Sequence, residues 1–133
     1  MQINPYLRFN GQCEAAMRLS EKCLGGKITM TLRYGESPAA SHTPVELARQ
    51  IIHATLTVGD FQLQASDCPP DKYEKPQGFS VTLQESDLAK AESVFNPLAE
   101  GGNITMPFGK TFWAKGFGMA TDKFGIPWMV NCG

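Results

Sequence analysis

The sequence predicts an α+β fold made of two copies of one module, each a strand, a helix and three more strands. Two observations lead to this prediction: a six-residue motif occurs twice, and strand-like and helix-like hydrophobic periods follow in the same order around both copies. The motif reads GGKITM at residues 25–30 and GGNITM at residues 101–106, an offset of 76 (101 − 25) with five of six residues identical. A length of 133 residues suits one such domain.

Each module opens with a strand and a helix. Residues 6–9 and 79–83 alternate apolar and polar side chains, as half-buried strands do. Apolar residues then recur at helical spacing over about residues 12–24 and 88–98, and a double glycine supplies the stop of each helix. The expected N-caps are Asn10 or Gly11 for the first helix and Ser86 or Asp87 for the second.

Three further strands complete each module, because the hydrophobic period returns to two after each double glycine. The pair Gly59 and Asp60 turns two of these strands into a hairpin, and the residues DKFG at positions 122–125 do the same in the second module. We expect strands at residues 28–33, 52–58 and 61–65, and again at residues 104–108, 111–121 and 126–131. The apolar side of the strand after each glycine pair is expected to carry Ile28, Met30 and Leu32, and Ile104, Met106 and Phe108.

The chain is therefore expected to be a single domain, residues 1–133, with modules at residues 1–67 and 79–133. A polar, proline-rich linker at residues 68–78 joins them. Residues 35–43 occur only in the first module and form a loop, which either covers a site or extends into solvent.

One helix covers only one face of a four-stranded sheet, so the other face stays open. Two such sheets, with their helices on the outside, would curl into a cup with a polar wall, which is a surface suited to a small molecule. The alternative is that the open faces are simply solvated. Period-two alternation places the following residues there: Tyr6, Arg8, His53, Thr55, Thr57, Gln62, Gln64, Ser80 and Thr82.

Composition excludes several classes of partner. The formal net charge is −1 and no block of like charges occurs, which argues against a nucleic-acid or anionic-membrane partner. No long apolar run and no signal-peptide pattern occur at the start, so we expect a cytoplasmic protein. The four cysteines are scattered without a C-x-x-C pair, which favours reduced thiols. No G-x-G-x-x-G turn is present, so no nucleotide is expected.

Several segments resemble the vicinal oxygen chelate (glyoxalase/bleomycin-resistance/dioxygenase) superfamily. These are PYLRFNGQCEAA, LGGKITM, IIHATLTVGD and above all TFWAKGFGMATDKFGIPWMVN, which together cover almost the whole chain. Within the superfamily they are similar to the PhnB-like branch, which is also labelled 3-demethylubiquinone 3-methyltransferase-like. The resemblance implies the cup-like fold, a small-molecule ligand and a homodimer. A methyltransferase activity is not expected, because the chain has no glycine-rich strand-to-helix turn to hold S-adenosylmethionine.

The resemblance also implies where a divalent metal would bind. Members commonly offer histidine or glutamate from the first strand of each module and glutamate from the last strand. Here those places fall on Asn4, Pro5 or Tyr6, on Ser80 or its neighbours, and on Met129. A thioether is a poor ligand for a hard ion. His53 remains the only candidate metal ligand.

The candidate site residues each have two interpretations. His53 either acts as a general acid or base, with Asp67 as its partner, or only forms a structural hydrogen bond. Arg8 either holds a carboxylate or phosphonate or lies over an aromatic ring. The C-terminal aromatic residues suit a core, a dimer contact or ligand stacking. The predicted ligand-binding set is Tyr6, Arg8, His53, Gln62, Gln64, Asp67, Trp113, Phe117 and Trp128.

The leading hypothesis is therefore a PhnB-like protein that binds a small molecule in a polar cup, without the usual three-ligand metal site. The alternative is a divalent-metal-dependent lyase, isomerase or dioxygenase. That alternative needs metal ligands beyond His53.

Overall fold

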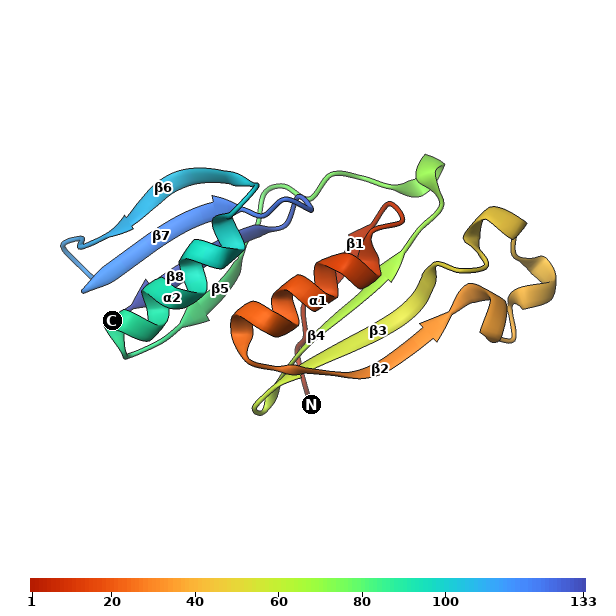
Figure 1. Cartoon of the computed structure of the whole chain (residues 1–133), viewed down its shortest axis with the longest axis horizontal. Helices are drawn as coiled ribbons and strands as arrows, with labels where there is room; N and C mark the ends of the chain where they lie inside the picture. The colour runs from red at the N-terminus through yellow and green to blue at the C-terminus, as the bar shows by residue number, and fades with distance from the viewer. The chain divides into compact units, whose positions relative to one another are not determined.

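The computed structural model describes residues 1–133, and the chain divides into two compact units, Met1–Glu74 and Lys75–Gly133. Each unit is a four-stranded mixed sheet with one α-helix (Figure 1). The division falls inside the segment expected to be a linker. The predicted α+β class and the duplicated module are confirmed, whereas the closure of the two sheets into one cup stays a prediction.

The first unit contains β1 (Tyr6–Phe9), α1 (Cys13–Leu24), β2 (Lys27–Arg33), β3 (Ile51–Val58) and β4 (Phe61–Asp67). The strand order is β1-β4-β3-β2, with β1 parallel to β4 and the other pairs antiparallel. The helix packs against β2, β3 and β4 and covers one face of the sheet. Leu7, Phe9 and Leu56 are buried on that face. The opposite face carries no helix of this unit.

The second unit repeats this arrangement. It contains β5 (Val81–Gln84), α2 (Leu88–Ala99), β6 (Asn103–Gly109), β7 (Gly116–Thr121) and β8 (Pro127–Cys132). The order β5-β8-β7-β6 matches that of the first unit, and β5 is again parallel to its neighbour. Its core joins Phe95 of α2 to Ala120 and Val130 of the sheet. Neither α-helix is long and apolar enough to cross a bilayer.

The repeated double glycine does the same two tasks in each unit. Gly25 and Gly101 have φ values of 70° and 77°, a left-handed conformation that glycine adopts at little cost where a helix ends. Gly26 lies so close to β3 that a Cβ atom there would come within 2.6 Å of the Thr57 carbonyl oxygen. Gly102 likewise abuts the Thr121 carbonyl oxygen. The motif therefore recurs because both units dock the helix-to-strand turn against a neighbouring strand.

The N-caps are predicted correctly for only one helix. The Asp87 side chain accepts a hydrogen bond from the Lys90 amide of α2 at 3.1 Å, as expected. For α1 the expected Asn10 or Gly11 is wrong, because Gln12 occupies the cap and offers no side-chain hydrogen bond. The Cys13 amide, at the start of the helix, instead donates to the Asp67 carboxylate at the end of β4.

A β-bulge corrects the predicted faces of β2 and β6. Ile28 pairs with Leu56 on the core side, but the register shifts before Met30, which pairs with Thr55. An extra residue in one strand reverses its alternation, so Met30 and Leu32 lie on the open face rather than the apolar one. The second unit repeats the shift, because Ile104 pairs with Ala120 and Met106 pairs with Met119. The prediction that Met30 and Met106 lie on the apolar side of their strands is therefore wrong.

Two strands begin later than expected. Phe79 and Ser80 precede β5, which starts at Val81. The segment before β7 forms a turn instead of a strand: the Thr111 amide donates to the Ala114 carbonyl at 3.1 Å, and the Ala114 amide donates back to Thr111 Oγ1 at 3.1 Å.

The loop predicted at residues 35–43 lies in the segment between β2 and β3, which contains three short 3₁₀ turns, Tyr34–Glu36, Ala40–His42 and Val45–Leu47. Arg33 fastens its two ends. Its guanidinium donates to the Arg49 carbonyl at 2.6 Å and to the Glu14 carboxylate at 3.0 Å. The segment stands at the end of the sheet where β2 stops and β3 begins (Figure 1).

Candidate functional site

The open face of the first sheet carries a continuous set of polar side chains. Tyr6 of β1 lies opposite Gln64 of β4, and Gln64 lies opposite Thr55 of β3. Residues directly opposite each other in a sheet share a face. One step further along, Arg8 lies opposite Ser66. Sequence alternation therefore predicted this face correctly for β1, β3 and β4.

His53 of β3 lies on this face, opposite Leu32 of β2. The Tyr6 hydroxyl is 3.3 Å from its Nδ1 atom, and the Thr55 hydroxyl is 3.3 Å from its Nε2 atom. The Tyr6 and His53 rings are also close, with centroids 5.8 Å apart. A neutral imidazole has one donor and one acceptor nitrogen, so one hydroxyl donates to the ring and the other accepts from it. The two hydroxyls accommodate either tautomer.

Arg8 is one of two cations on this face, the other being Lys27 of β2, which lies opposite Thr57. The Arg8 side chain is exposed, and no carboxylate of the structure forms an ion pair with it. Its positive charge also acts on the phenol of Tyr34. Burial is the main cause that raises the pKa of the Tyr34 phenol, and the Cys68 thiol and Asp67 carboxyl raise it further, whereas Arg8 acts in the opposite direction. Arg8 is thus a charged group available to an anion.

Gln62 and Gln64 complete the predicted set on this face. Their amides lie within 3.5 Å of each other, and Thr57 lies opposite Gln62. The Thr57 hydroxyl in turn lies 2.9 Å from that of Thr29. The part of the face around Thr57 is therefore rich in hydroxyl and amide groups and also carries Lys27, which lies opposite Thr57. The part around Tyr6 carries Arg8 and His53.

Asp67 does not belong to this face, so the predicted pairing with His53 is wrong. Its side chain is 2% exposed and lies on the core side, opposite Phe9. One carboxylate oxygen accepts the Cys13 amide and the other accepts the Ile51 amide, each at 2.9 Å. Asp67 thereby ties the start of α1 and the start of β3 to β4. Along β4 the side chain of Asp67 alternates with those of Gln64 and Ser66, so it points to the other face of the sheet.

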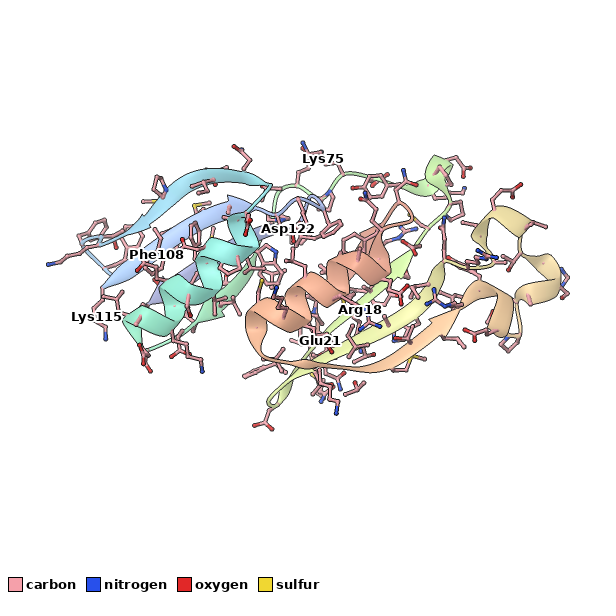
Figure 2. All side chains as sticks on the ribbon, viewed as in Figure 1. Arg18, Glu21, Lys75, Phe108, Lys115 and Asp122 are labelled. Atoms are coloured by element: carbon pink, nitrogen blue, oxygen red, sulfur yellow. The ribbon has the colours of Figure 1, made fainter.

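The prediction that Trp128 contacts a ligand is also wrong, because Trp128 is a core residue. Its side chain is 1% exposed, and its indole Nε1 donates to Asp122 Oδ2 at 2.9 Å. Asp122, labelled in Figure 2 where β7 ends, also accepts the amides of Phe124 and Ile126 at 2.8 and 3.0 Å. The DKFG turn is therefore built around one buried carboxylate.

Trp113 and Phe117 remain accessible in the second unit. Trp113 lies in the turn before β7 and is 49% exposed. Its ring meets the Phe117 ring edge-on at 5.3 Å and the almost fully exposed Phe112 ring at 4.7 Å. Phe117 lies opposite Asn131 on the open face of its sheet. Ligand binding by this aromatic group stays a prediction.

Sequence reasoning missed part of both open faces. In the first unit it missed Ser66, although Ser66 continues the alternation of the two glutamines. In the second unit the open face carries residues that alternate with the buried Val130 and Cys132 along β8. The missed residues are Ser66, Met30, Leu32, Gln84, Met106, Met119 and Asn131.

The side chains at the implied metal positions do not fit a hard divalent ion. Met129 lies opposite Thr82 and Met119, and Tyr6 lies opposite Gln64. These donors are thioethers, hydroxyls and an amide, whereas Mg²⁺, Mn²⁺ and Ca²⁺ prefer carboxylates and water. No three side chains of histidine, cysteine, aspartate or glutamate gather in a way that could hold a metal ion.

Two sheets of this order, each with one helix and an open face, define a glyoxalase-like fold. The chain belongs to the Glyoxalase/Bleomycin resistance protein/Dioxygenase superfamily, which it matches over residues 2–130.

Individual relatives agree with this assignment. Protein YjdN from Escherichia coli (strain K12) is 32% identical over 139 residues, which cover 98% of this chain and 95% of YjdN. The crystal structure of protein PA1353 from Pseudomonas aeruginosa has 48% sequence identity and a TM-score of 0.91, covering 99% of this chain and 97% of that one. The PhnB protein from Bacillus cereus has 25% identity and a TM-score of 0.84 over the full length of both chains. The resemblance to PhnB-like proteins is confirmed.

Proposed function

We propose that this protein binds a small organic anion, a carboxylate or a phosphonate, on the open face of its first sheet. The observation that carries the proposal is the position of Arg8, an arginine without an ion-pair partner, on the same face as a histidine held between two hydroxyls. The guanidinium fork matches the geometry of carboxylate and phosphonate oxygens and can bind them through two parallel hydrogen bonds.

The neighbouring groups suit the remainder of such a ligand. Tyr6 and Gln64 supply a hydroxyl and an amide in one cross-strand row. Their donors and acceptors would hold oxygen substituents next to the anionic group. Met30 and Leu32 continue the face on β2 and would contact apolar carbon atoms of the ligand. The face is therefore suited to a molecule with one anionic end and a short polar or apolar body.

The test is a thermal-shift screen with a panel of small carboxylates and phosphonates. A ligand present at about a hundred times its Kd stabilises a protein by about 2.7 kcal/mol, which raises Tm by several degrees. We expect at least one such ligand, and we expect Arg8→Gln to weaken it about tenfold or more, because charge-assisted hydrogen bonds are lost.

Arg18→Gln is the matched control. Arg18 is an exposed arginine on α1, within 4 Å of Glu14 and Glu21 (Figure 2). It lies on the helix and not on the open face, so its loss should leave ligand affinity unchanged. Equal weakening in both variants would show a non-specific charge effect and would overturn the proposed site.

We also propose that the protein is a homodimer, as the family resemblance implies. Light scattering coupled to gel filtration should give twice the chain mass of 14.6 kDa. A monomeric mass across the micromolar range would contradict this.

A further inference from the structure

The open face of the second sheet carries a row of three methionines. Met129 of β8 lies directly opposite Met119 of β7, and Met119 lies directly opposite Met106 of β6. Thr82 of β5 completes the row on the other side of Met129. The chain has only six methionines, so half of them stand in one cross-strand row.

The register brings the three thioethers within reach of one another. Directly opposite residues in an antiparallel pair have Cβ atoms about 4.5–5.5 Å apart. A methionine side chain has three rotatable bonds and adapts its sulfur position easily. All three side chains are half-buried rather than packed away, unlike Met17 in the first unit, which is 1% exposed. Their sulfur atoms can therefore come together above β7, the middle of the three strands that carry the row.

The row places three sulfur donors and a hydroxyl side by side: the thioethers of Met106, Met119 and Met129, and the hydroxyl of Thr82. Thioethers are soft ligands, and soft ligands select Cu(I) over hard ions such as Mg²⁺ or Mn²⁺. The donor set that fails to fit a hard divalent metal fits a soft monovalent one.

We propose that Met106, Met119 and Met129 form a binding site for Cu(I). This site goes beyond the proposed anion-binding function, because it lies in the other unit and uses different chemistry. No redox step is involved, since the ion is bound as Cu(I) and keeps its charge.

The experiment is an anaerobic titration with Cu(I) alone, followed by NMR of methionine ε-methyl groups. Cysteine thiolates would compete for the ion, so Cys23→Ser is the background variant. The other three cysteines are 0–3% exposed. Burial, with the nearby Asp67 and Glu14 carboxyls, raises the pKa of Cys13 to about 12, which keeps that thiol protonated at neutral pH. We expect saturation at one Cu(I) per chain, with shifts confined to the methyl groups of the three row methionines.

Variants supply the second readout, through competition with bicinchoninate. Met129→Leu keeps the shape of the side chain but removes the sulfur, and should weaken Cu(I) binding at least about tenfold, whereas Met30→Leu should not change it. Absence of Cu(I) uptake, equal shifts at Met30, or unchanged affinity in Met129→Leu would each overturn the proposal. The methyl shifts of the Cys23→Ser background do not depend on whether the methionine variants fold. A failed anion screen would leave this result unaffected, because the proposed anion site lies on the first sheet and the proposed Cu(I) site lies on the second.

Discussion

Replacing Asp122 with alanine should lower the free energy of unfolding of the second unit by much more than a typical single substitution does. The carboxylate is 3% exposed and accepts three hydrogen bonds, from the amides of Phe124 and Ile126 and from the indole of Trp128. Removing the carboxylate leaves these three donors without a partner, and two of them are buried. The turn also loses the group that its hydrogen bonds share.

The magnitude follows from the cost of each unpaired donor. A buried polar group left without its partner costs about 1–3 kcal/mol. Three such losses give a decrease in the free energy of unfolding of about 3–6 kcal/mol, allowing for water that reaches the turn. Typical domains have a total of about 5–15 kcal/mol, so the variant should be marginal at room temperature.

The assay is urea unfolding followed by tryptophan fluorescence. Trp128 is buried against Asp122, so its emission reports the unit directly. Asp87→Ala is the matched control, because Asp87 also accepts an amide hydrogen bond but is exposed at a helix N-cap. That variant should lose about 1 kcal/mol. A loss in Asp122→Ala no larger than in Asp87→Ala would refute the reasoning.

Three further predictions concern pH, packing and metal content. Burial raises the pKa of Cys13 from 9.0 to about 12. The folded state therefore holds a proton that the unfolded state releases, so stability is fully present below pH 9 and falls as pH rises towards 12, by about 4 kcal/mol at about 1.4 kcal/mol per pKa unit. Urea unfolding at several pH values should show that the free energy of unfolding falls less between pH 9 and 12 in Cys13→Ala than in the wild type. The same pH dependence in both proteins would contradict this prediction. Gly26→Ala should lower the free energy of unfolding by about 1–3 kcal/mol, because its Cβ would meet the Thr57 carbonyl oxygen at 2.6 Å. Gly109→Ala is the control and should be nearly neutral, because no atom lies within 4 Å of a Cβ at that position. Equal Tm values in the two variants would count against this prediction. Elemental analysis of protein purified without chelator or affinity tag should find no stoichiometric Mn, Fe, Ni or Zn, and such a metal lost on His53→Ala would revive the metal-dependent enzyme.

The duplicated architecture could be predicted because it rests on local signals that agree with one another. The double glycines mark a left-handed helix stop and a close approach to a strand, and both tasks demand glycine. Alternation in β1, β3 and β4 then assigns Tyr6, Arg8 and His53 to the open face without any knowledge of tertiary contacts.

The errors arise where a contact distant in sequence decides the local outcome. A bulge in β2 depends on pairing with β3 and cannot be read from β2 alone, so Met30 and Leu32 were placed on the wrong face. Asp67 and Trp128 look like site residues, because carboxylates and indoles often bind ligands. Their hydrogen-bond partners, the Cys13 amide and Asp122, identify them as structural only once the fold is known.

The chain's two histidines offer a direct test of the proposed anion site. His53 lies on the open face, whereas His42 lies exposed in the 3₁₀ insertion and serves as an internal control. NMR of the imidazole resonances during titration with the best carboxylate or phosphonate should show saturable shifts at His53 and none at His42. Binding that leaves the His53 resonances unmoved would contradict the account.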